Sequence, residues 1–236
     1  HLLDNFSKDD YVVFLGNVIG LGDKTKETLT SVIDLRNQLM AKHLIKPKKI
    51  IFLRGAQEEM FLKLLQLQTA PNPRDILEWM FEHGVDNTIK SYGFDKKDIL
   101  NLSSQGTIAI SKWTTKLNNA ILNQPGHKQY FTHLKHAAYG ESREILFLNR
   151  GVDVSRPLSA QNDCFWWGYQ NFSDLNKPYS SFVRIVRGYK SSNNNNLEHA
   201  KSKIVCSLFQ QPLNNNKIIA GIFSESGEIF DLFESS

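Results

Sequence analysis

The chain has 236 residues and a formal net charge of +4 at pH 7, and 41% of its residues are hydrophobic while 22% are charged. This composition excludes disordered and fibrous chains, and no apolar run approaches the roughly 20 residues that a membrane-spanning helix needs. The small positive charge is interspersed with acidic residues, so it does not indicate the basic stripe of a nucleic-acid-binding protein.

The first half of the sequence alternates strand patterns with helix patterns. Apolar runs at 11–16 and 49–54, each followed or closed by a glycine, predict two buried strands. Apolar residues at helical spacing predict one helix over 26–42 and a second that begins near residue 57. This order is typical of parallel strands joined by right-handed crossovers, and so predicts an α/β fold.

The next region, at about 71–140, has a mainly helical pattern that is punctuated by prolines. A short apolar cluster at 77–81 predicts one helix, and residues 108–122 predict a longer one. We therefore expect a helical insertion within one domain.

The second half of the sequence turns to strand patterns. Five strands are predicted, at 144–148, 182–187, 203–209, 217–223 and 228–233. Their close spacing favours antiparallel pairing, and residues 224–227 indicate a hairpin between the last two. The asparagine tracts at 193–196 and 214–216 predict polar loops.

The two cysteines, Cys164 and Cys206, lack CxxC spacing and lie in apolar contexts. We expect buried free thiols and a reducing compartment.

The sequence begins at His1 without a methionine or a signal peptide, and we expect a further segment to precede it. Serines such as Ser111 and Ser159 show no spacing to His and Asp that would indicate a nucleophile.

Glycine-closed segments follow both predicted N-terminal strands, at 16–22 and 54–58. Sheets of α/β proteins bind ligands just beyond such strand ends. The sequence resembles the bacterial-type calcineurin-like metallophosphoesterases of the phosphoprotein-phosphatase group, whose members carry GDxxDRG, RGNHE, VHAG and VHGH in this order. The corresponding segments here are 11–22, 51–60 (IFLRGAQEEM), 147–152 and 186–189.

The resemblance covers nearly the whole chain. It implies one domain over 1–236 with a four-layer metallophosphoesterase-like fold, in which a two-sheet β-sandwich is flanked by helices and the helical insertion lies at about 71–140. The family's opening motif, GDxHG, would precede His1.

The family uses these motifs to hold two metal ions and to place a catalytic histidine, and this sequence departs from the motifs at those positions. The residues found there are Asn17 and Gly20 for the two aspartates, Leu21 for the arginine, Ala56 and Gln57 for the Asn-His pair, Asn149 for the histidine of VHAG, and Arg187 and Tyr189 for the two histidines of VHGH. Two divalent ions need anionic carboxylates and neutral imidazoles around them. An amide carries no charge, an alanine has no donor atom, and a guanidinium stays protonated and repels a cation.

We therefore expect no metal, no cofactor and no catalytic residue. The expected function is that of a pseudophosphatase, a non-catalytic scaffold or interaction subunit whose partners are other protein subunits, as in a large organellar assembly. The bacterial resemblance and the cysteines suggest the mitochondrial matrix or the cytoplasm as its location.

Arg54, Arg150 and Arg187 would approach the former metal site if the resemblance holds. One hypothesis is that their guanidinium groups hold a phosphate or nucleotide without hydrolysing it. The alternative, which we favour, is that they pair with Glu58, Asp153 or other carboxylates and fill the cavity.

Two further function classes stay open. One is an active phosphoesterase with an unusual site, acting on serine/threonine phosphoproteins or on dinucleoside polyphosphates. The other is an RNA- or ribonucleoprotein-associated subunit, which rests only on the mild positive charge and would show steeply salt-dependent RNA binding.

Two residue clusters invite a functional interpretation and a simpler one. His127, His133 and His136 could indicate a metal site, with His133 and His136 on one helix face, but no cysteine or carboxylate completes the set, so we expect surface histidines. The aromatic block at 165–169 could bind a partner, but we expect it to pack in the core.

Overall fold

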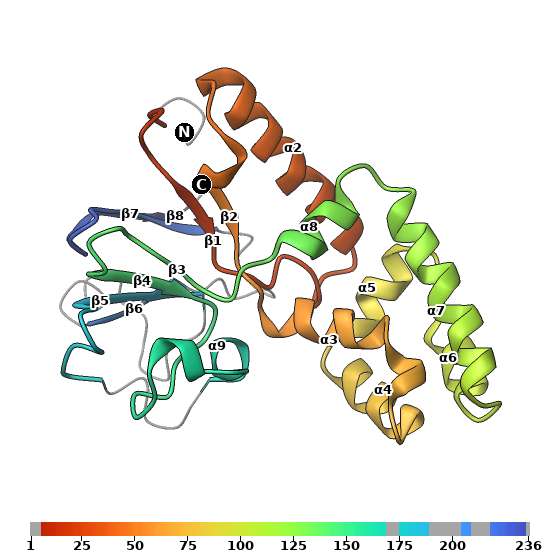
Figure 1. Cartoon of the computed structure of the whole chain (residues 1–236). Helices are drawn as coiled ribbons and strands as arrows, with labels where there is room; N and C mark the ends of the chain where they lie inside the picture. Colours follow the sequence, from red (N-terminus) through yellow and green to blue (C-terminus); the bar gives the residue numbers. More distant parts are fainter. Residues whose placement is uncertain (1–5, 169–174, 189–203, 209–217, 235–236) are drawn as a thin grey trace. The chain divides into compact units, whose positions relative to one another are not determined.

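The computed structural model describes residues 6–168, 175–188, 204–208 and 218–234 (Figure 1). The contacts within the chain divide it into two compact units. The helical unit comprises His1–Val12, Asn17–Phe52 and Gln57–Leu134. The strand unit comprises Val13–Gly16, Leu53–Ala56 and Lys135–Ser236. The mixed α/β composition that the sequence predicts is confirmed.

The helical unit contains most of the helices. They are α2 (Thr25–His43), α3 (Ala56–Leu64), α4 (Pro73–Glu82), α5 (Val85–Ser91), α6 (Lys96–Ser103), α7 (Thr107–Leu122) and α8 (His127–His133), with 3₁₀ turns at Pro47–Lys49 and Leu67–Thr69. The residues from α4 to α8 confirm the helical region predicted at about 71–140. No helix among the described residues is long and apolar enough to cross a membrane.

Helix α2 shows why its sequence folds locally as predicted. Leu29, Ile33 and Leu39 are buried and lie on one face, as the helical spacing requires. The helix ends at His43, and Leu44 follows it in the left-handed conformation with φ 52° and ψ 38°. Glycine is the usual residue at such a helix end, because a side chain there is strained.

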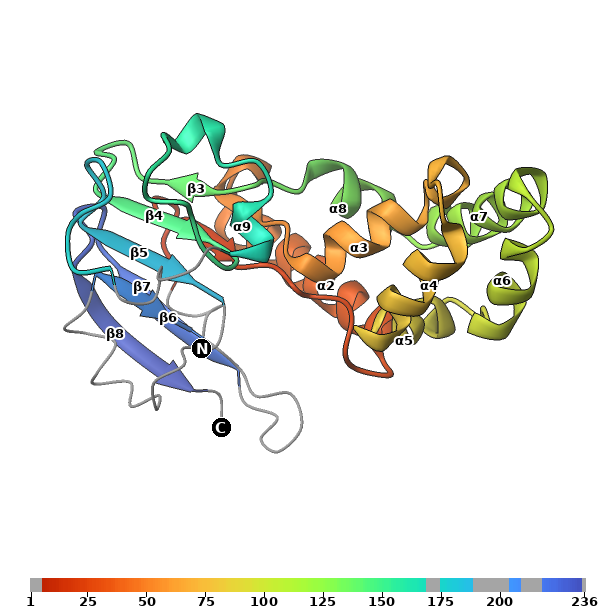
Figure 2. The ribbon, with the colours of Figure 1, turned by 90° about the horizontal axis from the view of Figure 1, so that it is seen from below.

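The strand unit is built on a four-stranded sheet in the order β3-β4-β5-β6 (Figure 2). These strands are Ala138–Tyr139, Ile145–Leu148, Arg184–Arg187 and Val205–Ser207. The hairpin of β7 (Ile219–Phe223) and β8 (Ile229–Glu234) is antiparallel, and it turns through 224–227 as predicted.

Antiparallel pairing across the second half of the sequence is wrong as a general prediction. It holds for β3 with β4 and for β7 with β8, but β4 pairs with β5, and β5 with β6, in parallel. The connection from β4 to β5, residues 149–183, contains a 3₁₀ turn at Leu158–Ala160 and the helix α9 (Cys164–Trp167). Two parallel strands begin at the same end of the sheet, so the chain must run back along the whole length of β4 before β5 begins. A connection of this length is sufficient for that return.

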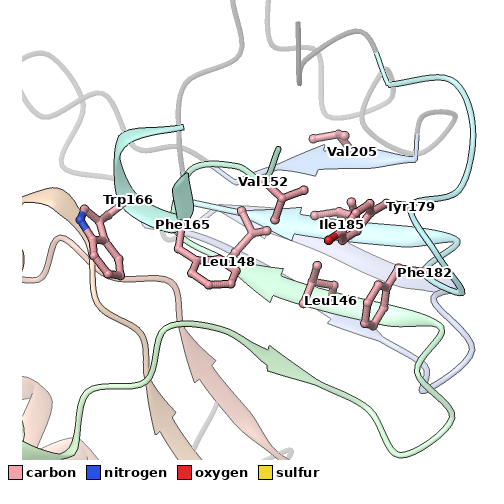
Figure 3. Packing of buried hydrophobic residues seen from close by; sticks show 9 residues of the cluster. All are labelled: Leu146, Leu148, Val152, Phe165, Trp166, Tyr179, Phe182, Ile185 and Val205. Atoms are coloured by element: carbon pink, nitrogen blue, oxygen red, sulfur yellow. The ribbon is translucent and has the colours of Figure 1, made fainter. Parts of the chain in front are cut away.

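The two faces of this sheet pack against different elements because strand side chains alternate between faces. Leu146 and Leu148 join the larger core cluster with Phe165 and Trp166 of α9 (Figure 3). Ile145 of β4 faces the opposite way and belongs to the cluster that the β7–β8 hairpin covers. Core packing of the block at 165–168 is thereby confirmed, whereas Tyr169 lies outside the described residues.

The two N-terminal strands are confirmed but are shorter than predicted. They are β1 (Val12–Phe14) and β2 (Ile50–Phe52). Just beyond β2, the N–H of Leu53 donates to the carbonyl oxygen of Phe14 at 2.9 Å within the strand unit. The asparagine tracts at 193–196 and 214–216 lie outside the described residues.

Candidate functional site

The residues that the family resemblance places at metal and catalytic positions are divided between the two units. The helical unit holds Asn17, Gly20, Leu21 and Gln57. The strand unit holds Ala56, Asn149 and Arg187, together with the candidate phosphate ligands Arg54 and Arg150. Tyr189 lies outside the described residues.

In the helical unit, the segment after β1 wraps around a carboxylate. The side chain of Glu58, on α3, has no exposed surface. Its oxygens accept hydrogen bonds from the backbone N–H groups of Asn17, Val18 and Ile19 at 2.8, 2.7 and 3.3 Å. Successive N–H groups that point at one spot form an anion-binding concavity. Glu58 therefore fills this concavity from within the chain.

Tyr130 of α8 completes the surroundings of Glu58. Its hydroxyl donates to Glu58 Oε1 at 3.1 Å. Burial raises the pKa of Tyr130 well above its ordinary value, and the negative charge of Glu58 and the hydrogen bond to it act in the same direction. The phenol is therefore a fixed donor to the carboxylate.

Two amides make local hydrogen bonds in the helical unit: Asn17, which the resemblance places at a metal-ligand position, and Gln57, which it places at the catalytic histidine. Asn17 Oδ1 accepts the backbone N–H of Gln57 at 3.0 Å, so it caps one of the unsatisfied N–H groups in the first turn of α3. Gln57 Nε2 donates to the carbonyl oxygen of His83 at 2.8 Å. A Cβ atom at Gly20 would lie 2.4 Å from Gln57 Cδ, so Gln57 occupies the space that a side chain at position 20 would need.

In the strand unit, Asn149 follows β4 and is fully buried. Its Nδ2 donates to the carbonyl oxygen of Leu15 at 2.7 Å, whereas its Oδ1 has no hydrogen-bond partner among the described residues. Gly16 lies against it with φ +88°, and a Cβ there would come within 2.7 Å of the backbone nitrogen of Gly55. Glycine is thus required at position 16 by both conformation and space.

Two of the three arginines form one local network. Arg187, at the end of β5, is 4% exposed. Its Nε donates to Ser207 Oγ at 2.8 Å and its Nη1 to the carbonyl oxygen of Arg150 at 3.2 Å. Arg54 places its guanidinium 5.5 Å from the ring centroid of Trp166. That spacing is within the range of a cation–π contact.

The carboxylate of Asp153, suggested from the sequence as a partner for these arginines, is engaged elsewhere. Asp153 Oδ2 lies 3.0 Å from Arg156 Nε, and Asp153 Oδ1 accepts from Ser155 Oγ at 2.6 Å. The hydrogen bond from the Ser155 side chain and the charge of Arg156 lower the pKa of Asp153. Arg156 is therefore the ion-pair partner of Asp153.

Two of the three histidines, His133 and His136, are exposed as predicted, and the third is not. His127 is fully buried, which corrects that prediction. Its Nδ1 lies 2.6 Å from the Tyr92 hydroxyl and its Nε2 lies 3.0 Å from Thr30 Oγ1. His133 is exposed as predicted, but it ends α8, so His136 does not share a helix face with it. The imidazole of His136 contacts the Trp166 ring at a centroid distance of 5.1 Å.

The two cysteines are free thiols, as the sequence predicts. Cys206 is buried, and its burial raises the pKa of the thiol to about 11. Cys164, at the start of α9, is half-buried, so full burial was wrong for this residue. A thiol with a raised pKa is a weak nucleophile near neutral pH, so Cys206 serves packing.

The donor atoms at the former ligand positions do not fit a pair of dications. The helical unit offers amides at 17 and 57, and the strand unit offers an amide at 149 and a guanidinium at 187. Within the described part of the chain, no group of three or more His, Cys, Asp or Glu side chains is placed to hold a metal ion.

Sequence reasoning missed the roles of Glu58 and Tyr130. Glu58 matches the last residue of the RGNHE motif of the family that the sequence resembles, and that match was the one sequence signal for a role at this position. No protein-family model matches this sequence, and a search of curated proteins finds no match either.

Proposed function

We propose that this chain is a metallophosphoesterase-like domain that does not hydrolyse phosphate esters and serves as a scaffold or interaction subunit. The finer architecture belongs to the same proposal: a four-layer fold with two packed sheets flanked by helices. The order and spacing of four motifs support the resemblance, and the residues at the former ligand positions support the loss of chemistry.

One observation carries the proposal. Three amide side chains at the positions that the resemblance assigns to metal ligands or to the catalytic histidine form hydrogen bonds to the main chain. Asn17 accepts from the backbone of Gln57, Gln57 donates to that of His83, and Asn149 donates to that of Leu15. Side chains used in this way hold loops and helix ends in place, which is a task of the fold rather than of a reaction.

A direct assay tests this proposal. The purified chain is incubated with manganese and a generic phosphate ester, beside an active metallophosphoesterase, and bound metal is measured by elemental analysis. We expect no hydrolysis above the blank and less than one metal ion per chain. The Asn149→Ala variant separates this protein from a contaminant, since contaminating activity survives the substitution. Hydrolysis that Asn149→Ala abolishes, or two bound metal ions, would contradict the proposal.

Phosphate or nucleotide binding without hydrolysis is a second candidate. The observation that favours it is that the strand unit contains all three arginines, with Arg187 hydrogen-bonded to the carbonyl of Arg150 and Arg54 stacked over Trp166. One guanidinium group can donate two parallel hydrogen bonds to two oxygens of a phosphate. Isothermal titration with inorganic phosphate, nucleotides and phosphorylated peptides tests it.

The expected result for this second candidate is binding that Arg187→Ala weakens by about tenfold or more, which corresponds to loss of one charge-assisted contact. Arg36→Ala, an arginine of α2 in the helical unit, is the control and should bind as the parent chain does. Binding that survives Arg187→Ala unchanged would rule out this candidate.

A further inference from the structure

The helical unit exposes large apolar side chains on the segment before α2 and on α4. Leu21 is 60% exposed and Trp79, on α4, is 42% exposed. The Trp79 ring lies 4.4 Å from the His83 ring between centroids, and Leu21 Cδ2 lies 2.8 Å from where a Cβ at Gly84 would be. Leu21, Trp79 and His83 are named here the tryptophan patch. Tryptophan is one of the residues most enriched in binding hot spots.

Exposed charged residues near these positions in the sequence include more acidic than basic side chains: Asp23, Asp75, Glu78 and Glu82 against Lys24 and Arg74, of which Arg74 pairs with Glu78 at 3.0 Å. Asp75 and Glu82 are exposed and lie four residues before and three residues after Trp79, which puts them on the same side of α4. Asp23 is exposed two residues after Leu21. An apolar centre with an acidic rim fits a segment in which an apolar side chain is flanked by lysines or arginines.

The same unit carries such a segment at the other end of α2. Leu44 is 91% exposed, with Lys42, Lys46 and Lys48 exposed around it. Residues 42–48 are named here the lysine loop. Leu44 has a positive φ of 52°, where glycine would be less strained, and it buries almost nothing within the chain. A leucine at this position therefore serves neither the backbone conformation nor the core of its own chain.

We propose that the occupant of the tryptophan patch is the lysine loop of a second copy of this chain. The two surfaces are complementary: Leu44 of one copy would pack on Trp79 of the other, and the lysines of the loop would lie near the carboxylates around the patch. Within one copy the two surfaces lie at opposite ends of α2, whose 19 residues span about 28 Å. The contact therefore joins two copies head to tail, and each copy keeps one patch and one loop for further copies.

This contact extends the proposed scaffold role by naming one partner, and it does not depend on the loss of hydrolysis, which the manganese assay tests separately. A contact built on one leucine and one tryptophan is small, so assembly depends on protein concentration. Because lysines face carboxylates, it also weakens as salt is raised.

Sedimentation velocity over a range of protein concentrations tests the proposal. The expected result is a rise in average mass with concentration that is reduced at high salt. Leu44→Gly and Trp79→Ala should each remain monomeric over the same range. Leu44→Gly relieves the positive-φ strain, so loss of assembly in this variant cannot come from unfolding. Ile108→Ala, which changes another exposed apolar residue of the same unit, is the control and should assemble like the parent chain.

Mixing the two variants gives the sharpest test. Trp79→Ala keeps its lysine loop and Leu44→Gly keeps its tryptophan patch, so an equimolar mixture should form heterodimers and nothing longer. A parent chain that stays monomeric at every concentration overturns the proposal, as do variants that assemble like the parent and a mixture that stays monomeric. A monomeric chain whose patch binds an unrelated lysine-rich peptide also overturns it.

Discussion

Replacing Glu58 by alanine is expected to lower the free energy of unfolding by about 3–5 kcal/mol. The substitution removes a buried carboxylate that accepts three backbone N–H groups and the Tyr130 hydroxyl. Each hydrogen bond to a charged group contributes about 1.5–3 kcal/mol, and these contributions are not additive. Urea denaturation, followed by circular dichroism, measures the change.

Two further variants separate the carboxylate from the space that it fills. Glu58→Gln keeps one acceptor oxygen but turns an NH₂ group toward the N–H groups of 17–19, so we expect a loss of about 1–3 kcal/mol. Glu78→Ala is the matched control, because Glu78 is exposed and its ion-pair partner among the described residues is Arg74 at 3.0 Å. An exposed pair of this kind contributes about 0.5 kcal/mol or less. If Glu58→Ala lowered the free energy of unfolding no more than Glu78→Ala does, the anion concavity would have no role in stability.

Hydrophobic periodicity was sufficient to predict those helices and strands whose buried face follows from their own sequence. The observed bounds lie within about two residues of the predicted ones for α2, α7, β4, β5 and β8. In each of these elements the spacing of the apolar residues along the sequence shows which face is buried. The direction of β5 relative to β4 was predicted wrongly. It depends on where the connection 149–183 returns to the sheet, and strand spacing alone carries no information about that path.

The candidate site was predictable only in part. The motif resemblance pointed to the positions of the candidate site, because motif positions are fixed by their order along the chain. The contacts found there join residues far apart in the sequence: the backbone N–H of Asn17 donates to Glu58 across 41 positions, and the Tyr130 hydroxyl donates to Glu58 across 72. His127 sits in a polar stretch typical of an exposed helix, and its burial is decided by Tyr92 and Thr30, 35 and 97 positions away.

The hydrogen bonds of His127 define which of its two ring nitrogens carries the proton of the neutral imidazole. Thr30 Oγ1 lies 3.0 Å from the carbonyl oxygen of Lys26 and donates its single proton there. His127 Nε2–H then donates to Thr30 Oγ1, and the Tyr92 hydroxyl donates to His127 Nδ1. The neutral imidazole satisfies all of these partners. A second proton, on Nδ1, would face the hydroxyl proton of Tyr92 and break this arrangement.

Stability is therefore expected to fall as the pH drops below about 6.5, the ordinary pKa of histidine. Burial lowers the pKa of His127 in the folded chain, and the charge of Lys26 acts in the same direction. Between that lowered pKa and about 6.5 the unfolded chain binds the proton and the folded chain does not. The free energy of unfolding then decreases with falling pH, by at most about 1.4 kcal/mol per pH unit for this one group, and the full contribution is present above pH 6.5.

Urea denaturation at a series of pH values from 7.5 to about 5 measures this slope in the parent chain and in His127→Gln, which keeps polar atoms but cannot take up the proton. The slope should be smaller in His127→Gln, although that variant is less stable at every pH because its amide cannot reproduce both contacts. His133→Gln, on the exposed surface of the same helix, should keep the parent slope. Equal slopes in the parent chain and His127→Gln would show that the buried imidazole takes up its proton as readily in the folded chain as in the unfolded one.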